Sequence, residues 1–323
     1  MNRTTRGGSG MLWVRLGVSL GLLAVLAAYL DLERVATRLR SMDVRWVVLA
    51  LVISLSQIAL SAWRWRFTAG RLGLHLPFVT ALREYALGSF LNQLLPGGVA
   101  GDLARAWRHG RSLSRGLDGQ AVRAVVLERA SGQIVMLAVA GLSFAWLPRS
   151  FGAGGRAVLL SVALVPAAIM IGLFVWARLR RDSDDSLLRR AWADARAGLF
   201  SPRALPAQLI SSGAIVASYI TVYLVAARAV GVDTPMPTLL PLVAPVLVTM
   251  LIPLTIAGWG VRETGAALLW GAAGLPTADG VAISLAYGLL VLVSSLPGAA
   301  ILIAGPPKPV SSDRDRKPHR CRD

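Results

Sequence analysis

The long uncharged stretches of this chain constrain its fold more than any other feature. Residues 281–304 run for 24 positions without a charged side chain, and residues 207–227 and 239–259 do so for 21 positions each. A helix needs about 20 apolar residues to cross the roughly 30 Å hydrocarbon core of a bilayer. Charged residues make up only 16% of the chain, against about 25% in soluble domains. The sequence therefore predicts an all-α polytopic membrane protein.

The strongly basic character of the chain also fits a membrane. The net charge is +17, and the basic residues lie between the apolar runs, where they meet lipid headgroups. We therefore expect a membrane phospholipid as partner and no nucleic acid. The single cysteine, Cys321, lies in a polar tail and cannot form an internal disulfide.

Six segments are predicted to cross the membrane fully. They are residues 12–30, 46–63, 122–147, 158–176, 207–227 and 281–304. The arginine-rich connections after residues 105 and 176 indicate the cytoplasmic side, and they place both termini in the cytoplasm of a multi-pass cell-membrane protein. Arg34, Arg38 and Arg40 oppose this arrangement, because they fall in a loop that it places outside.

Two further segments are interrupted near their middle and are predicted to form re-entrant helical hairpins. Residues 79–105 and 239–275 each contain a cluster of helix-breaking residues. The arms of the first segment have about 12 residues and reach only about 18 Å; in the second segment the second arm, residues 264–275, is too short to cross, whereas its first arm could cross. Backbone of this kind is tolerated at membrane depth only where protein or a wet cavity surrounds it. The residues assigned to the breaks are Pro96, Gly97, Gly98, Gly101, Gly258 and Gly260.

The order of these segments repeats as helix, helix, hairpin, helix. Three crossings in each half would turn the second copy over, which is the inverted-repeat plan of many transporters. The predicted organisation has a cytoplasmic N-terminus at residues 1–11 and a membrane domain at residues 12–304, with halves at about 12–147 and 157–304. A disordered cytoplasmic tail follows at residues 305–323.

Ionisable residues beside the two breaks are candidates for substrate binding. Charges in apolar segments are costly and by default indicate function. The candidate residues are Asn92, Asp102, Arg105, Glu128, Arg129, Arg262 and Glu263. One hypothesis has Arg105 and Arg262 hold a lipid phosphate, with Glu128 and Glu263 as counter-charges. The alternative is that these residues form internal ion pairs and interfacial anchors.

Three motifs resemble one known family. Residues 92–107 read NQLLPGGVAGDLARAW, residues 125–132 read VVLERASG, and residues 258–263 read GWGVRE. In this order they resemble the membrane domain of lysylphosphatidylglycerol synthetases, which also occurs alone in flippase-like proteins. The resemblance covers about residues 12–304 and implies movement of an anionic or aminoacylated phospholipid, or of a lipid-linked sugar, between leaflets. The 19 residues after Ala304 are too few for the soluble synthase domain, so synthase activity is not expected.

Two other functions stay open at this point. One is a non-catalytic membrane partner of a separately encoded lipid-modifying enzyme or glycosyltransferase, and the other is a membrane-embedded transferase. His75, His109 and His319 are not grouped with acids as a catalytic base or metal site requires. A glycine-rich nucleotide loop is also missing from the sequence. We therefore expect no catalytic residue, cofactor or metal site.

Overall fold

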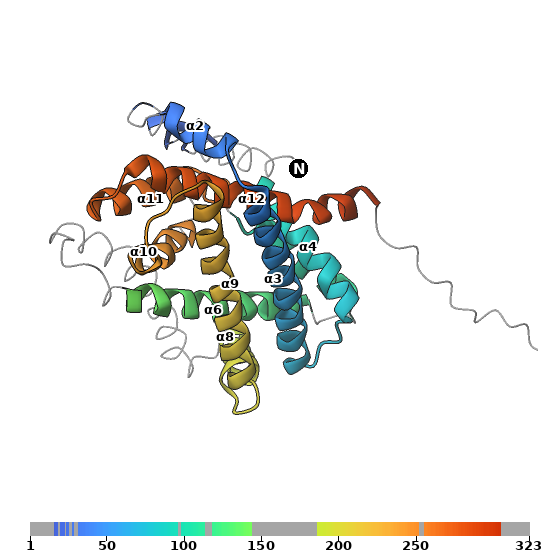
Figure 1. The fold of residues 1–323 in the computed structure, drawn as a ribbon. Coiled ribbons are helices and arrows are strands. Elements are labelled where there is room, and N and C mark those ends of the chain that lie inside the picture. The colour runs from blue at the N-terminus through green and yellow to red at the C-terminus, as the bar shows by residue number, and fades with distance from the viewer. Residues whose placement is uncertain are drawn as a thin grey trace, which may run out of the picture.

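The described part of the chain folds into long and short helices (Figure 1). A computed structural model describes residues 32–95, 98–113, 118–143, 186–251 and 255–304, with a few positions between 16 and 28. In chain order the elements are α2 (Leu32–Arg40), α3 (Val44–Arg71), α4 (Phe78–Leu94), α5 (Ala100–Arg111), α6 (Asp118–Ser143), α8 (Ser186–Ala195), η3 (Arg196–Phe200), α9 (Leu205–Ala229), α10 (Met236–Val248), η4 (Thr249–Leu251), α11 (Val261–Ala272) and α12 (Thr277–Ala304).

Four of the described helices are long and apolar enough to cross a membrane. They are α3, α9, α12 and the part of α6 from Gly119 to Ser143. They cover four of the six predicted crossings. The expected crossings at residues 12–30 and 158–176 lie mostly or wholly outside the described residues. The chain is therefore an all-helical membrane protein.

Both interrupted segments form pairs of shorter helices. In the first, α4 packs against α5, and in the second α10 packs against α11. The connections between them use left-handed backbone, with φ of 62° at Gly98, 80° at Gly258 and 89° at Gly260. An L-residue with a side chain rarely adopts such angles, so glycine allows the chain to turn there. Pro96 and Gly97 lie outside the described residues.

The long helices run in opposite directions in the two halves. The Asp43 amide at the start of α3 donates to the Ala229 carbonyl at the end of α9 over 3.0 Å, so these two helices are antiparallel. Helix α6 begins at the other end of α3, where Gln120 Nε2 donates to the Leu72 carbonyl over 2.8 Å. Helix α12 begins beside α2, near the start of α3. In Figure 1, α6 and α12 accordingly run in opposite directions.

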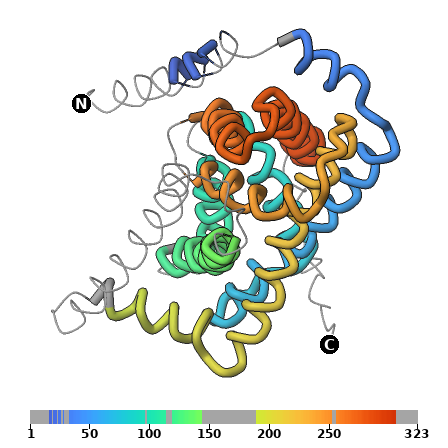
Figure 2. The backbone as a smooth tube through the Cα atoms, turned by 60° about the vertical axis from the view of Figure 1, so that its left-hand side comes forward, coloured from blue at the N-terminus to red at the C-terminus, as the bar shows by residue number. Residues whose placement is uncertain are grey.

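The packing of the helices repeats as well. Helix α4 packs against α12 as α10 packs against α6, and α5 packs against α6 as α11 packs against α12. Each hairpin therefore touches a long helix of both halves, and in Figure 2 segments of the first half (blue to green) lie among segments of the second half (yellow to red). The described helices form an inverted repeat. The exact boundary between the halves stays a prediction, because residues 144–185 lie outside the described part.

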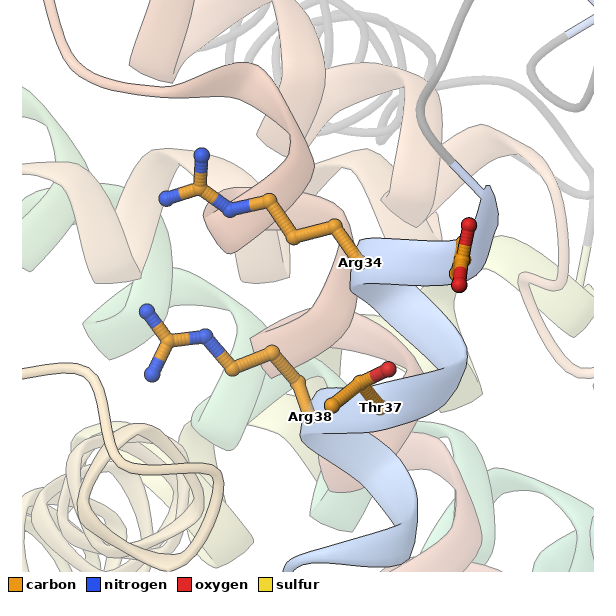
Figure 3. A pocket seen from close by; sticks show the side chains of 4 residues that line it. Arg34, Thr37 and Arg38 are labelled. Atoms are coloured by element: carbon orange, nitrogen blue, oxygen red, sulfur yellow. The ribbon is translucent and has the colours of Figure 1, made fainter.

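Helix α2 accounts for two of the three arginines that opposed the predicted orientation. Arg34 and Arg38 approach Asp279 of α12 with Nη2–Oδ1 distances of 3.2 and 3.6 Å. Arg38 also donates to the carbonyls of Val230 and Gly231, just after the end of α9. Figure 3 shows Arg34, Thr37 and Arg38 around a shallow pocket on this helix. These arginines therefore make contacts within the protein. The positive-inside rule instead assumes that arginines in a loop lie at the lipid headgroups.

The hydrophobic core is divided between the two ends of the α3–α9 pair. The larger cluster gathers around Tyr223, Trp270 and Tyr287, and a second cluster surrounds Trp65. Large apolar side chains also cover the outside of the long helices, including Ile210 at 73% and Ile303 at 87% exposure. Such exposure suits contact with lipid, which is as apolar as the side chains themselves.

Gly101 should be essential to the first hairpin. A Cβ atom at this position would lie 1.9 Å from the Gly88 carbonyl oxygen, so Gly101→Ala must push α5 away from α4. We expect a loss of about 1–3 kcal/mol in stability, measured as a lower unfolding temperature of the purified protein in detergent. Gly141→Ala is the control, since a Cβ there has no neighbour within 4 Å. Equal unfolding temperatures for the two variants would contradict the close contact.

Candidate functional site

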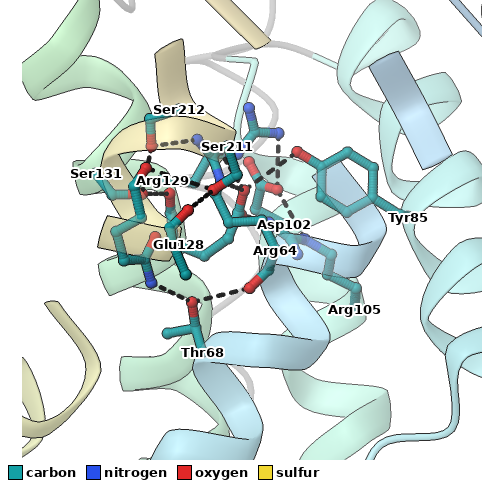
Figure 4. Close-up of polar contacts among 12 residues, drawn as sticks. Arg64, Thr68, Tyr85, Asp102, Arg105, Glu128, Arg129, Ser131, Ser211 and Ser212 are labelled. Carbon is teal, nitrogen blue, oxygen red and sulfur yellow. Dashed lines mark hydrogen bonds and ion pairs between the residues drawn. The ribbon is translucent and has the colours of Figure 1, made fainter. Parts of the chain in front are cut away.

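A buried carboxylate on α6 joins α3 to the first hairpin. Glu128 is fully buried. Its Oε1 accepts hydrogen bonds from Arg64 Nε at 3.2 Å and Nη2 at 2.6 Å, and its Oε2 accepts from Arg105 Nη2 at 2.7 Å. The side chains converge on this carboxylate from separate helices (Figure 4). A buried charge is tolerated only when it is paired in this way.

Asp102 extends these contacts from the start of α5. Its Oδ1 accepts from Arg105 Nε at 3.0 Å and from Arg129 Nη2 at 2.8 Å. Its Oδ2 accepts from Asn92 Nδ2 at 3.3 Å, while Asn92 Oδ1 accepts from the Gly101 amide at 2.7 Å. Asn92 therefore satisfies a free amide in the first turn of α5 and ties the two arms of the hairpin together.

The charges of this cluster do not balance. We call Arg64, Asp102, Arg105, Glu128 and Arg129 the Glu128 network. Three guanidinium groups meet two carboxylates, which leaves one positive charge in excess. Arg105 Nη1 and Arg129 Nε are buried and have no hydrogen-bond partner among the described residues. The network therefore holds one positive charge that none of its own carboxylates matches.

The second hairpin holds a smaller and neutral cluster. Arg262 Nη2 and Glu263 Oε1 are 2.6 Å apart, and Ser284 contacts both side chains. Glu263 Oε2 accepts from the Gly260 amide at 2.7 Å, as Asn92 does from Gly101 in the first hairpin. The guanidinium carbon of Arg262 lies 5.3 Å from the centre of the Trp259 ring. This pair stabilises the start of α11.

A cavity of about 390 Å³ lies between the two hairpins and the long helices. This volume falls in the range of small-molecule sites. Its wall contains residues from α3, α4, α6, α9 and α12 and from both helix breaks. Its polar lining residues are Ser54, Gln57, Ser61, Arg64, Tyr85, Ser89, Asn92, Gln93, Arg129, Gln133, Tyr219, Thr255, Tyr287, Ser294 and Ser295. The remainder of the wall is largely apolar, with Ile58, Ile215, Val216, Leu247 and Val291 among its side chains.

The sequence-predicted site residues occupy different places around this cavity. Asn92, Asp102, Arg105, Glu128 and Arg129 come together in one cluster, while Arg262 and Glu263 form the other. Of these seven, Asn92 and Arg129 line the cavity. Arg105 and Arg262, proposed from the sequence as the phosphate ligands, are 1% and 2% exposed behind its wall. Their substrate-binding role stays a prediction, and this placement favours a supporting role.

Sequence reasoning missed Arg64. The predicted crossing ends at Trp63, one residue before it, whereas α3 continues to Arg71 and Arg64 is buried. The sequence contains no helix-breaking residue near Arg64, and this could have indicated that the helix continues past it. Tyr85 was missed too; its ring centre lies 4.5 Å from the Arg105 guanidinium carbon and 5.9 Å from that of Arg129. Cation–π contacts of this kind have no sequence signature.

The fold and the cavity define a polytopic helical membrane protein with two hairpins around a polar, arginine-bearing site. The family model for the lysylphosphatidylglycerol synthase transmembrane region matches residues 12–298. The chain belongs to this family, which associates it with membrane lipids. No curated protein matches the chain. Within the described ranges, no group of three or more His, Cys, Asp or Glu side chains could hold a metal ion.

Glu128→Gln should destabilise the protein strongly. The change removes a buried charge shared by Arg64 and Arg105, and it raises the excess positive charge around them. Breaking a buried ion pair in this way costs about 3–5 kcal/mol, which should appear as a lower unfolding temperature or loss of folded protein. Glu84→Gln is the matched control, because its pair with Arg108 is partly exposed and is worth about 0–1 kcal/mol. Similar losses for both variants would refute a central role for Glu128.

Proposed function

We propose that the protein binds the headgroup of an anionic phospholipid in the central cavity and moves the lipid between the leaflets. The observation that carries this proposal is the excess positive charge of the Glu128 network, which reaches the cavity wall through Arg129 and Arg64. A phosphodiester has one negative charge, so one headgroup would balance the network.

Arg129 is the best placed direct ligand. Its side chain is 34% exposed and lines the cavity, while its Nη2 is held by Asp102 at 2.8 Å. An arginine fixed on one edge can present its remaining donors to a phosphate without losing much side-chain freedom. Arg64 lines the same wall but gives its donors to Glu128 and Ser212. We assign Arg129 to phosphate contact and Arg64 to positioning.

The inverted repeat supplies a route for the lipid. Sites of this architecture lie between broken helices, and alternating access arises when one repeat rocks against the other. Here both breaks reach the cavity, with Gly98 and Val99 from the first hairpin and Thr255 and Gly258 from the second. The apolar side chains of the wall would contact the first carbons of the acyl chains, while the polar side chains contact the headgroup.

Arg129→Gln should slow lipid movement without unfolding the protein. In liposomes that contain the purified protein and no ATP, we expect transfer of a fluorescent phosphatidylglycerol between leaflets to fall about tenfold. A hydrogen bond to a charged group is worth roughly 1.5–3 kcal/mol, and 1.4 kcal/mol corresponds to a factor of ten. Arg189→Gln, an exposed residue of α8, is the control and should transfer lipid at the unaltered rate.

Two results would count against this function. The phosphate contact is wrong if Arg129→Gln, folded and present at equal density, moves the lipid as fast as Arg189→Gln does. A covalently altered lipid in the same liposomes would instead indicate a transferase. Arg262→Lys serves as a further comparison, because a buried supporting pair should alter stability more than the rate of lipid transfer.

The orientation in the membrane follows from the arginine-rich connections. We propose that the α3–α4 loop and the end of α5 face the cytoplasm, since basic residues flank this hairpin on both sides. In a Cys321→Ser background, exposed His75→Cys and Ser112→Cys should react with a membrane-impermeant thiol reagent only after the membrane is opened. Labelling of either position in intact cells would overturn this orientation.

A further inference from the structure

We infer that the lipid headgroup carried in this cavity has no positive charge and is rich in hydroxyl groups, as in a phosphodiester of glycerol, inositol or a sugar. This inference rests on the proposed function and narrows its substrate. It separates this chain from the aminoacylated cargo that the family's description suggests, because a lysylated headgroup carries ammonium groups beside its phosphate.

The charges on the cavity wall argue against a cationic headgroup. The described lining residues include Arg64 and Arg129 but no aspartate or glutamate. The carboxylates of Asp102 and Glu128, which contact the two arginines of the wall, already accept hydrogen bonds from arginines. An ammonium group in this cavity would meet like charge without a carboxylate to pair with, and like charges in contact cost affinity.

Two of the three tyrosine rings on the cavity wall already contact arginines of the protein itself. A ring face can bind a cation, and three tyrosines line the cavity. The Tyr85 ring already contacts the guanidinium groups of Arg105 and Arg129. The Tyr287 ring contacts Arg262, with 5.2 Å between the guanidinium carbon and the ring centre. Two of the three rings are therefore occupied by the protein's own cations.

The remaining polar wall suits hydroxyl groups. Amides of glutamine and asparagine and hydroxyls of serine and threonine can each both donate and accept hydrogen bonds. Two of them stand out: Ser54 and Thr255 are 5% and 2% exposed, line the cavity, and have buried side-chain oxygens without a hydrogen-bond partner among the described residues. Leaving a buried hydroxyl unpaired is costly. Ser54 belongs to α3 and Thr255 to the second break, so a polyol could bridge the two halves.

Competition between lipids tests this inference. Native mass spectrometry of the full-length protein would use an equimolar mixture of phosphatidylglycerol, phosphatidylinositol, phosphatidylethanolamine and lysyl-phosphatidylglycerol with identical acyl chains. We expect the first two lipids to occupy the protein at least about fivefold more than the last two. Arg129→Gln should reduce binding of the anionic lipids, because it removes the phosphate ligand.

A single substitution should change this preference. Gln57→Glu adds a carboxylate to the wall, and it keeps the oxygen that accepts from Ser218 Oγ at 3.0 Å. We expect it to raise the share of bound lysyl-phosphatidylglycerol several-fold relative to phosphatidylglycerol. Ser41→Glu adds the same charge at an exposed position that follows α2 and should leave the share unchanged.

The possible outcomes separate the two proposals. Equal or stronger binding of lysyl-phosphatidylglycerol by the unaltered protein would overturn the headgroup assignment, while a loss of lipid in Arg129→Gln would still support the proposed function. Both proposals would be overturned if all four lipids bound and Arg129→Gln bound each of them as well as the unaltered protein does. An unchanged lipid share in Gln57→Glu would show that the wall charge does not select the headgroup and would also refute the inference.

Discussion

The carboxylate of Glu128 holds the first half of this protein together. It lies on α6, accepts from Arg64 of α3 and Arg105 of α5, and is fully buried. Each arginine on its own would cost several kcal/mol to remove from water. The ion pairs therefore stabilise one arrangement of the three helices over others. Apolar contacts between helices select an arrangement less strongly in a membrane, because lipid tails are as apolar as the helix surfaces.

The Glu128 network has one positive charge in excess. The same side chains that hold the helices together would therefore also attract the anionic headgroup in the proposed function. A fully neutral cluster, such as Arg262 with Glu263, supports its helix break and offers an anion nothing further. The Glu128 network differs because Arg129 lines the cavity and the network holds one more guanidinium than carboxylate. A bound phosphate would balance the charge of the Glu128 network, so the lipid would be recognised at the place where the fold leaves a positive charge unmatched.

Much of the architecture could be predicted from the sequence. The apolar runs indicated four crossings that the described helices contain, and the proline and glycine clusters indicated two hairpins. Charge counting was less informative, because Arg34 and Arg38 of α2 are engaged by Asp279 and by carbonyls after α9. A rule that compares loops cannot distinguish an arginine at a headgroup from one bound to a partner about 240 residues away.

The sequence by itself determined that the chain is a helical membrane protein, where its helices break and that charged residues lie beside those breaks. These features depend on local composition, because each segment by itself must be long and apolar enough to cross the bilayer. Only the tertiary structure decided which charges meet. Arg64 and Glu128 are 64 residues apart, and their pairing depends on how α3 packs against α6. For the same reason, only the fold shows that Arg129 faces the cavity while Arg105 and Arg262 lie behind its wall.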